Sequence, residues 1–386
     1  MKGIFSFHPV GHGLFYTGNI KHSSTNDEVN FIYDIGSMSH VQIATAVKKF
    51  CDKTKKVDFV FLSHLDKDHI SGLYDLLKHK TQIDTIIMPY YSWNHIKFIK
   101  YENLKDFEKN IYIYKDYPYD TLEFLLDFYC NPYSCLGQYN IKILIYSTLD
   151  ISKIDIPIDT DFRHSEPLHN TDDVILKSLL ESEYQVKYTR KRNVFLVHPD
   201  NTKKTTITYK DWVFDIKQPG FNLKHKIEIE KITSDLNDTF SNYHDEEKRN
   251  NTTKKAKKYI KNNDCITLKH YPYGSKHRKE HTLLTGDFCG ESMYTNTSGL
   301  LANGMEYYVV QIPHHGSEIQ PNITIDAKTE YSVACYSSED KKHPNASTIK
   351  AYEKISSKPI VHVTEQGETI FNYEYDNQRQ PPMNGL

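Results

Sequence analysis

The chain has 386 residues, of which 38% are hydrophobic and 25% charged, a composition typical of a soluble globular protein with a packed core. Its formal net charge of -2 at pH 7 argues against a protein that coats nucleic acid through a strongly basic surface, so any such contact needs a local patch. No stretch approaches the roughly 20 apolar residues of a transmembrane helix, and the first residues lack the apolar run of a signal peptide, so we expect a soluble cytoplasmic protein without a membrane partner.

The first third of the chain predicts strands with helices between them. Residues 1–35 predict two strands joined by a polar hairpin or loop, and residues 40–50 predict a helix from the spacing of their apolar side chains. A buried strand at 57–62, a helix at 70–77 and a second strand at 85–89 then form a βαβ unit. Such units place ligands at the carboxyl ends of their strands.

The rest of the chain is regular only towards its end. Residues 100–140 are predicted to be helical, and residues 141–260 are interpreted as an insertion of unclear structure with a few short strands. Beyond them we predict strands at 264–269, 281–286, 307–313 and 331–336, a helix at 346–354, and a final strand pair at 360–364 and 369–373. The predicted organisation is one α/β (α+β) fold in two halves, residues 1–140 and 261–386, separated by the insertion.

The six cysteines are scattered along the chain and form no C-x-x-C pair. In a cytosolic protein this pattern predicts reduced, mostly buried thiols rather than disulfides or a zinc knuckle.

The strongest chemical signal is the segment 63–69, which reads Ser-His-Leu-Asp-Lys-Asp-His. Its four potential ligands, His64, Asp66, Asp68 and His69, follow a predicted buried strand and precede a predicted helix. Imidazole and carboxylate groups together suit zinc, manganese or iron better than magnesium alone. The other interpretation is a solvated turn with Asp68 as the helix cap, but it poorly explains four such residues at this place. We therefore predict a metal site.

Three further segments carry histidine or aspartate at turns. Asp287 follows Gly286 at the end of a predicted strand, where a carboxylate is well placed to bridge two metal ions. The pair His314 and His315 also follows a predicted strand and precedes a glycine that lets the chain turn. His343 stands at the entry to the last predicted helix. The segments at Asp287 and His343 are ordinary turns when taken alone, so it is the combination of strand ends that predicts one site.

Together these motifs resemble the metallo-β-lactamase superfamily, whose signature H-x-H-x-D-H lies on the turn after a strand. The resemblance is closest to the hydrolase domain of ComEC-type competence proteins, which reads S-H-x-D-x-D-H-x-G-G, L-L-T-G-D, P-H-H-G-S and H-P. The same motifs stand here at residues 63–72, 283–287, 313–317 and 343–344. The sequence V-G-H-G at 10–13 and D-I-G at 34–36 resemble the subgroup's V-G-Q-G and D-x-G.

The resemblance implies an αββα sandwich with two divalent metal ions, zinc or manganese, at one edge of its sheets. It assigns His64 and Asp66, with a later histidine, to one ion. It assigns Asp68 and His69 to the other, with Asp287 bridging and either His314 or His315 completing the set. We take as metal ligands His64, Asp66, Asp68, His69, Asp287 and His314. We take as catalytic residues Asp68, His315 and His343, the two histidines serving as proton donors or phosphate contacts.

Several positions depart from the subgroup. Asp66 replaces the second histidine of the superfamily signature, which makes the site harder and more favourable to manganese. Ser71 and Leu14 stand where the subgroup has glycine and, often, aspartate. A further histidine ligand between residues 70 and 286 is not evident, because His164 and His169 qualify by position only and such residues usually lie on the surface.

The function that this resemblance implies is phosphodiester hydrolysis by a nuclease or nucleotide phosphodiesterase, with a nucleic acid or nucleotide as the substrate and a role in DNA processing or defence. The basic stretches 187–192 and 254–261 are candidates for phosphate contacts, although a solvated loop is the commoner explanation of such stretches. Two alternatives stay open at this point. One is hydrolysis of a small ester, thioester or lactam, and the other is a binding or regulatory subunit that has lost activity.

Overall fold

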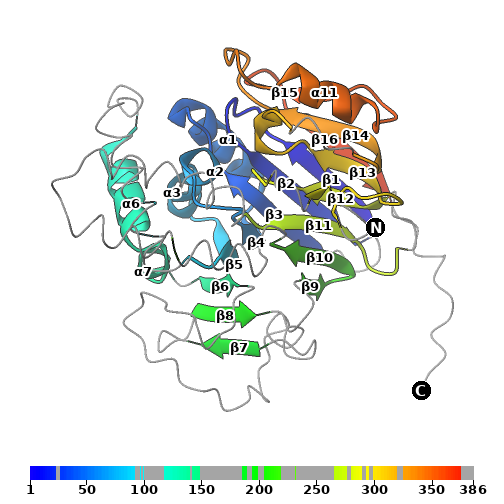
Figure 1. Ribbon diagram of the computed structural model, residues 1–386. Helices are drawn as coiled ribbons and strands as arrows, with labels where there is room; N and C mark the ends of the chain where they lie inside the picture. Colours follow the sequence, from blue (N-terminus) through cyan, green and yellow to red (C-terminus); the bar gives the residue numbers. More distant parts are fainter. Residues whose placement is uncertain are drawn as a thin grey trace, which may run out of the picture.

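The computed structural model contains two β-sheets that pack face to face, with helices against the outer side of each sheet (Figure 1). This mixed content confirms the predicted α+β class at the level of secondary structure. The structure describes residues 1–22, 27–91, 96, 99, 117–139, 141–147, 185–188, 194–198, 204–218, 231, 265–275, 280–288, 293–294, 299–319 and 325–374.

The first sheet has nine strands in the order β16-β1-β2-β3-β4-β5-β6-β8-β7. Strands β1 to β3 form an antiparallel meander, and the run from β3 to β8 is parallel, as expected for strands joined by helical crossovers. Strands β16 and β7 pair antiparallel at its two edges. The strands are β1 (Lys2–Phe7), β2 (Phe15–Lys21), β3 (Glu28–Ile35), β4 (Lys56–Phe61), β5 (Gln82–Pro89), β6 (Lys142–Tyr146), β7 (Gln185–Tyr188), β8 (Val194–His198) and β16 (Thr369–Glu374).

The second sheet has seven strands in the order β15-β14-β13-β12-β11-β10-β9. Strands β9 to β12 are antiparallel to one another, whereas β12 to β15 run parallel. The parallel half matters for function because its strands end at one common edge. The strands are β9 (Lys204–Tyr209), β10 (Trp212–Lys217), β11 (Thr267–Pro272), β12 (Thr282–Leu284), β13 (Glu306–Gln311), β14 (Lys328–Cys335) and β15 (Val361–Val363).

The space between the sheets is filled largely by aromatic side chains. Phe31 of the first sheet packs edge-on against Phe214 of the second, with ring centroids 5.1 Å apart. Phe59 and Phe61 contact the same ring at 5.3 and 5.4 Å. Each such buried side chain stabilises the fold by about 1.5–3 kcal/mol relative to an exposed one, so this core holds the sheets together independently of any ligand.

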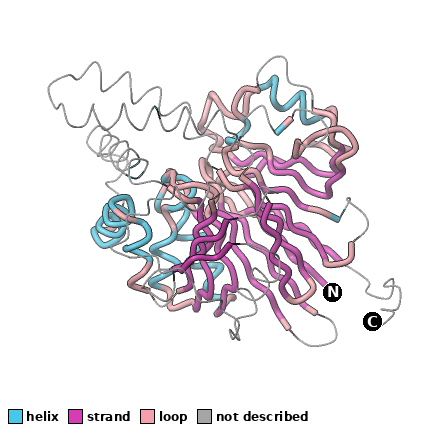
Figure 2. The backbone as a smooth tube through the Cα atoms, turned by 60° about the horizontal axis from the view of Figure 1, so that its bottom comes forward, coloured by secondary structure: helices cyan, strands magenta, loops and turns pink. Residues whose placement is uncertain are grey.

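Helices cover the outer faces of both sheets, as Figure 2 shows in cyan beside the magenta strands. On the first sheet they pack on apolar side chains of β3 to β6, and on the second sheet the last helix packs through Tyr352. The helices are α1 (His40–Lys53), α2 (Lys67–Ile70), α3 (Leu73–Lys78), α6 (Tyr119–Cys130), α7 (Pro132–Leu136) and α11 (Ala346–Glu353). The predictions of helices at 40–50 and 346–354 are confirmed, and α6 and α7 confirm the helical part of 100–140 that the structure describes.

Two strand predictions were wrong. The first 35 residues contain three strands rather than two, because residues 2–7 pair with β2 along their whole length. The two strands at the end of the chain do not pair with each other. β15 joins the second sheet beside β14, while β16 returns to the first sheet and covers the edge of β1, which would otherwise expose unpaired backbone groups.

The helix predicted at 70–77 is interrupted, so α2 and α3 are separate. At the break the backbone N–H of Gly72 donates to the carbonyl of Ile35. A Cβ atom at Gly72 would lie 2.4 Å from the side chain of Ile43, so the chain passes tightly between β3 and α1 there. This contact holds the turn that carries the predicted metal ligands against the end of β3.

The described strands of the segment 141–260 belong to both sheets. β6, β7 and β8 extend the first sheet, and β9 and β10 begin the second. The remainder of that segment lies outside the described residues, so its interpretation as an insertion stays a prediction. Among the described residues no helix is long and apolar enough to cross a membrane. The five cysteines that the structure describes are free thiols, four of them buried, as predicted.

Candidate metal centre

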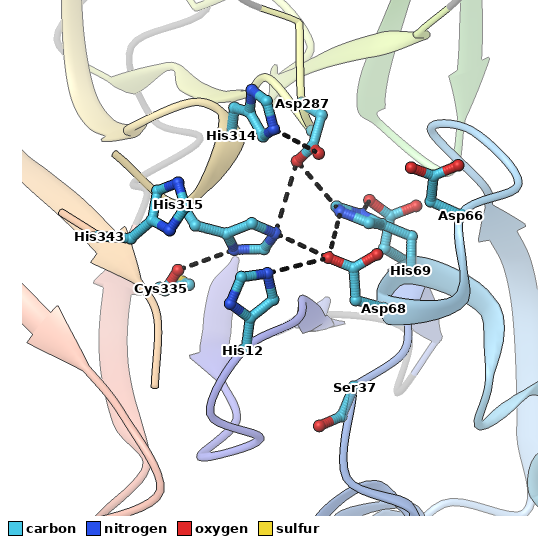
Figure 3. A network of polar contacts seen from close by, with 12 residues as sticks. His12, Ser37, Asp66, Asp68, His69, Asp287, His314, His315, Cys335 and His343 are labelled. Carbon is cyan, nitrogen blue, oxygen red and sulfur yellow. Dashed lines mark hydrogen bonds and ion pairs between the residues drawn. The ribbon is translucent and has the colours of Figure 1, made fainter. Parts of the chain in front are cut away.

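The carboxyl ends of strands from both sheets meet at one edge of the molecule, and the predicted site residues gather there (Figure 3). The turn after β4 supplies His64, Asp66, Asp68 and His69. The turn after β12 supplies Asp287. The 3-10 turn η4 (His314–Gly316), after β13, supplies the histidine pair. The six predicted ligands thus come together, although they are far apart in the sequence.

Asp287 lies at the middle of this group and faces four imidazole rings with its two carboxylate oxygens. Its Oδ1 is 3.1 Å from Nε2 of His69 and 3.6 Å from Nε2 of His315. Its Oδ2 is 3.8 Å from Nε2 of His64 and 3.6 Å from Nε2 of His314. The two oxygens therefore divide the histidines into two pairs, one pair on each side of the carboxylate.

The remaining aspartates each belong to one of these pairs. Oδ2 of Asp68 is 3.0 Å from Nε2 of His315 and 3.8 Å from Nε2 of His69. Oδ2 of Asp66 is 3.7 Å from Nε2 of His64. One half of the group is consequently Asp68, His69 and His315 with Oδ1 of Asp287. The other is Asp66, His64 and His314 with Oδ2.

The hydrogen bonds of the Nδ1 atoms fix which ring nitrogen of the histidines faces the centre. Nδ1 of His69 donates to Oδ2 of Asp34 at 2.8 Å, and Nδ1 of His315 donates to the carbonyl of Cys335 at 2.9 Å. The hydroxyl of Ser63 donates to Asp34 at 2.6 Å, so it accepts from Nδ1 of His64 at 2.9 Å. When Nδ1 carries the proton, the Nε2 atom of a neutral ring offers a lone pair, the arrangement of metal-ligating histidines.

Several backbone conformations at this edge are ones that ordinary residues avoid. Asp34, His314 and His315 have φ angles of 55°, 49° and 53°. Gly286 has φ 55°, and a Cβ atom there would lie 2.7 Å from that of Ser63. Such left-handed conformations cost free energy for residues with a side chain and persist only where the surroundings enforce them, which is common at functional sites.

The charges of the group are strongly coupled. Burial opposes ionisation of Asp68 and Asp287, but the adjacent imidazoles outweigh it and hold the pKa of both carboxyl groups below their usual range. Burial likewise opposes protonation of His69 and His315, yet Asp287 and Asp68 raise the pKa of both rings. Among the described residues no lysine or arginine forms an ion pair with Asp68 or Asp287. The group therefore requires positive charge that the side chains supply only as bound protons.

A divalent cation fits this requirement. Nε2 of His64, Nε2 of His69 and Oδ1 of Asp287 are buried and make no hydrogen bond of good geometry, the last two facing each other at 3.1 Å. These three side chains have ligand atoms within 4.8 Å of one another. Buried polar atoms without a partner are costly and rare in proteins, whereas imidazole nitrogens and carboxylate oxygens are good ligands for zinc and manganese.

Two residues beside the centre, His12 and Asp340, were not identified from the sequence as part of the site. Asp340 has its Oδ2 atom 2.8 Å from Nδ1 of His343 and 3.2 Å from Nδ1 of His12. Nε2 of His343 is 3.0 Å from the hydroxyl of Ser317. His343 is thus near the predicted ligands but contacts a hydroxyl and a carboxylate. The glycines around His12 were a sequence signal of a tight loop, whereas nothing in the sequence distinguished Asp340.

Asp34 was noticed in the sequence only through the D-x-G motif, and the structure gives it a clear place. Its side chain is fully buried and accepts hydrogen bonds from the backbone and hydroxyl of Ser63 and from His69. Other candidates cannot be placed here, because His164, His169 and the stretch 254–261 lie outside the described residues, as do the side chains of 187–192.

No protein-family model matches the sequence, and no curated protein matches it.

Proposed function

We propose that this chain is a metal-dependent hydrolase with the metallo-β-lactamase αββα fold, and that it cleaves phosphodiester bonds in a nucleic acid or nucleotide. The motifs of the ComEC-type hydrolase domain support the family, and the face-to-face sheets with helices outside are compatible with that fold. The geometry of the side chains at the shared strand edge supports the chemistry.

The observation that carries the proposal is the position of Asp287 between two sets of donors. Its Oδ1 faces His69 and His315, and its Oδ2 faces His64 and His314. A carboxylate placed in this way would bridge two cations, with Asp68 on one side and Asp66 on the other. Two metals bound there would supply a water of lowered pKa and stabilise negative charge on the attacked group.

The side chains of the centre differ in exposure, which defines the side from which a substrate would enter. The side chains of His64, His69 and His315 are 4%, 0% and 3% exposed, so they lie at the bottom of the group. Those of His314 and His343 are 36% and 22% exposed. We therefore place the substrate beside His314 and His343. For His315, which lies in the interior, we favour the role of a metal ligand over that of a proton donor.

His343 is suited to handle the leaving oxygen. Asp340 accepts from its Nδ1, which leaves Nε2 directed towards the hydroxyl of Ser317. When Nε2 is protonated as well, an imidazole held by a carboxylate in this way is oriented to donate that proton or a hydrogen bond to an oxygen that develops charge. His314, which is more exposed, is placed to contact a phosphate oxygen or to complete the second ligand set.

The test is a cleavage assay with purified protein loaded with Mn²⁺ or Zn²⁺. Substrates are single- and double-stranded DNA, RNA and bis-p-nitrophenyl phosphate, with nitrocefin and a thioester in parallel. Asp68→Asn removes a charge from the centre, and we expect it to lower phosphodiester cleavage at least a hundredfold. Asp75→Asn is the matched control, because Asp75 is also a buried aspartate paired with a histidine, His40, but belongs to the packing of α3 against α1.

The outcomes separate the candidate functions. Metal-dependent cleavage of a phosphodiester by wild type and by Asp75→Asn, but not by Asp68→Asn, supports the proposal. Cleavage of nitrocefin or the thioester alone would assign the small-ester or lactam reaction instead. Fewer than one bound metal per chain after loading, with no cleavage of any substrate, would point to a binding or regulatory subunit. Equal activity of wild type and Asp68→Asn would refute the proposed centre.

A further inference from the structure

The loop between β1 and β2 brings one more imidazole to the Asp68 side of the centre. Nε2 of His12 lies 3.5 Å from Oδ2 of Asp68, and its ring centroid is 4.4 Å from that of His315. His12, Asp68 and His315 have ligand atoms within 4.8 Å of one another, as in the set formed by His64, His69 and Asp287. His12 is therefore close enough to share a cation with them.

The tautomer of His12 follows from its partner on the other side of the ring. Nδ1 of His12 is 3.2 Å from Oδ2 of Asp340, and a carboxylate only accepts, so this nitrogen carries a proton in the contact. Nε2 of the neutral ring then directs a lone pair at the carboxylate of Asp68, which repels it unless a proton or a metal cation lies between them. The same relation holds for His69, whose Nδ1 donates to Asp34.

The loop that carries His12 is fixed to the turn that carries Asp68. The backbone N–H of Leu14 donates to the carbonyl of Asp68 at 3.1 Å. A Cβ atom at Gly13 would lie 2.8 Å from the same carbonyl oxygen, so the loop approaches that turn as closely as backbone allows. The carbonyl of His12 accepts from the N–H of Met38 at 2.8 Å. His12 is thus held in place by backbone contacts on both sides.

The opposite side of His12 is fixed as well. Glu365 accepts hydrogen bonds from the backbone and hydroxyl of Ser338, in the loop that carries Asp340. A Cβ atom at Gly11 would lie 2.6 Å from Oε1 of the same glutamate. Glu365 therefore lies against both loops and keeps Asp340 within reach of His12. A ring fixed between two carboxylates in this way is preorganised for a cation rather than an incidental neighbour.

We propose that His12 is a direct metal ligand on the Asp68 side of the centre, with Asp340 as the positioning residue that orients it. This inference rests on the proposed metal centre. On this side the donors become five, namely His12, Asp68, His69, His315 and Asp287. Five donors exceed the four of a tetrahedral zinc site and suit an ion with a higher coordination number, such as Mn²⁺.

The test measures metal binding rather than turnover. Mn²⁺ is titrated against a chelator into wild type, His12→Ala, His12→Gln and Asp340→Asn, with circular dichroism to check folding. His362→Ala is the control, because His362 is exposed and its described side-chain partner is the hydroxyl of Tyr336. We expect wild type to bind two ions. Both His12 variants should weaken the binding of one ion more than a hundredfold and leave the affinity for the other within threefold of wild type. Asp340→Asn should weaken the binding of that first ion by about 10–100-fold.

The NMR spectrum of the Co²⁺-loaded protein separates a ligand from a neighbour. A histidine bound through Nε2 shows one strongly shifted, exchangeable Nδ1–H signal. We expect His12→Gln to lose one such signal, and Asp340→Asn to move that signal while the others stay. If both ions bind the His12 variants as they bind wild type and no shifted signal is lost or moved, the His12 assignment is wrong and the metal centre stands. If wild type binds no metal, the proposed function itself fails.

Should neither His12 variant fold, Asp340→Asn still decides the question. It leaves His12 in place, so an unmoved spectrum and unchanged Mn²⁺ affinity in that variant would overturn the proposal.

Discussion

Asp34 offers the sharpest test of how the centre is organised, because it contacts one proposed ligand directly and a second through Ser63 without being a ligand itself. It accepts from Nδ1 of His69 directly and reaches His64 through the hydroxyl of Ser63. Asp34→Asn keeps the shape of the side chain, and asparagine tolerates the φ angle of 55° found there. The substitution replaces one accepting oxygen by an NH₂ group. In place of Oδ2 this group loses the hydrogen bonds from the Ser63 hydroxyl and from His69, and in place of Oδ1 it loses the one from the backbone N–H of Ser63.

The expected magnitude follows from the contacts that are lost. His64 and His69 belong to different halves of the centre, so both metal affinities should fall. Loss of such an outer partner weakens binding about 10–100-fold, which is about 1.4–2.8 kcal/mol per ion. The metal-free protein should also lose stability, because a charge-assisted hydrogen bond of this kind contributes about 1.5–3 kcal/mol.

The assay is a chelator competition for Mn²⁺ together with urea unfolding of the metal-free protein. Asp75→Asn is again the control, since it disrupts a buried aspartate–histidine contact at α3. We expect both variants to lose stability but only Asp34→Asn to lose metal affinity. If Asp34→Asn binds both ions as wild type does while losing as much stability as Asp75→Asn, then Asp34 is a packing residue and the tautomer argument is wrong.

Four further outcomes are expected. In urea unfolding, Gly286→Ala should lower the free energy of unfolding by about 1–3 kcal/mol more than Gly304→Ala. Both glycines have positive φ, but a Cβ at Gly286 meets Ser63 at 2.7 Å whereas nothing lies within 4 Å of one at Gly304. Equal losses would contradict the tight packing of the turn at Gly286. Metal affinity should rise with pH through the raised pKa of His69, with proton release on binding seen by calorimetry in buffers of different ionisation enthalpy, and a flat profile would contradict the coupling. Without metal, the stability that His69 contributes is complete below its ordinary pKa of 6.5 and is lost as pH rises through its raised pKa in the folded protein. The stability that Asp287 contributes is present above its ordinary pKa of 3.8 and is lost as pH falls through its lowered pKa in the folded protein. The free energy of unfolding should therefore peak between pH 3.8 and 6.5. Removal of metal held at a hundred times its Kd should lower the unfolding free energy by about 2.7 kcal/mol per site.

Much of the site could be predicted from the sequence because its residues lie close to strand ends. Apolar runs predicted β4, β12 and β13, and polar residues after each run marked the turns at which Asp68, Asp287 and His315 lie. Since parallel strands of one sheet end at one edge, the pattern was enough to predict that the turns after β12 and β13 meet, whereas the resemblance placed the turn after β4, in the other sheet, beside them.

Other features depended on long-range packing that local patterns do not encode. The return of β16 to the first sheet is decided by its pairing with β1, at the opposite end of the chain. The break between α2 and α3 is decided by the contact of Gly72 with Ile43. Asp340 belongs to a polar turn of ordinary composition, and only its position between His12 and His343 gives it a role.

The distribution of the donors over two sheets has a mechanical consequence. Asp68 follows a strand of the first sheet and His315 follows a strand of the second, and these residues are 247 positions apart in the chain. An ion held by both would act as a cross-link that closes a very long loop, and in simple entropic models a loop of this length restricts the unfolded chain by about 5.5 kcal/mol. The aromatic core already joins the sheets in the interior, so the metals would add a link between them at the edge where the site lies. Hydrogen exchange should therefore slow on metal binding chiefly at the carboxyl ends of β4, β12 and β13, where opening of the two sheets would begin.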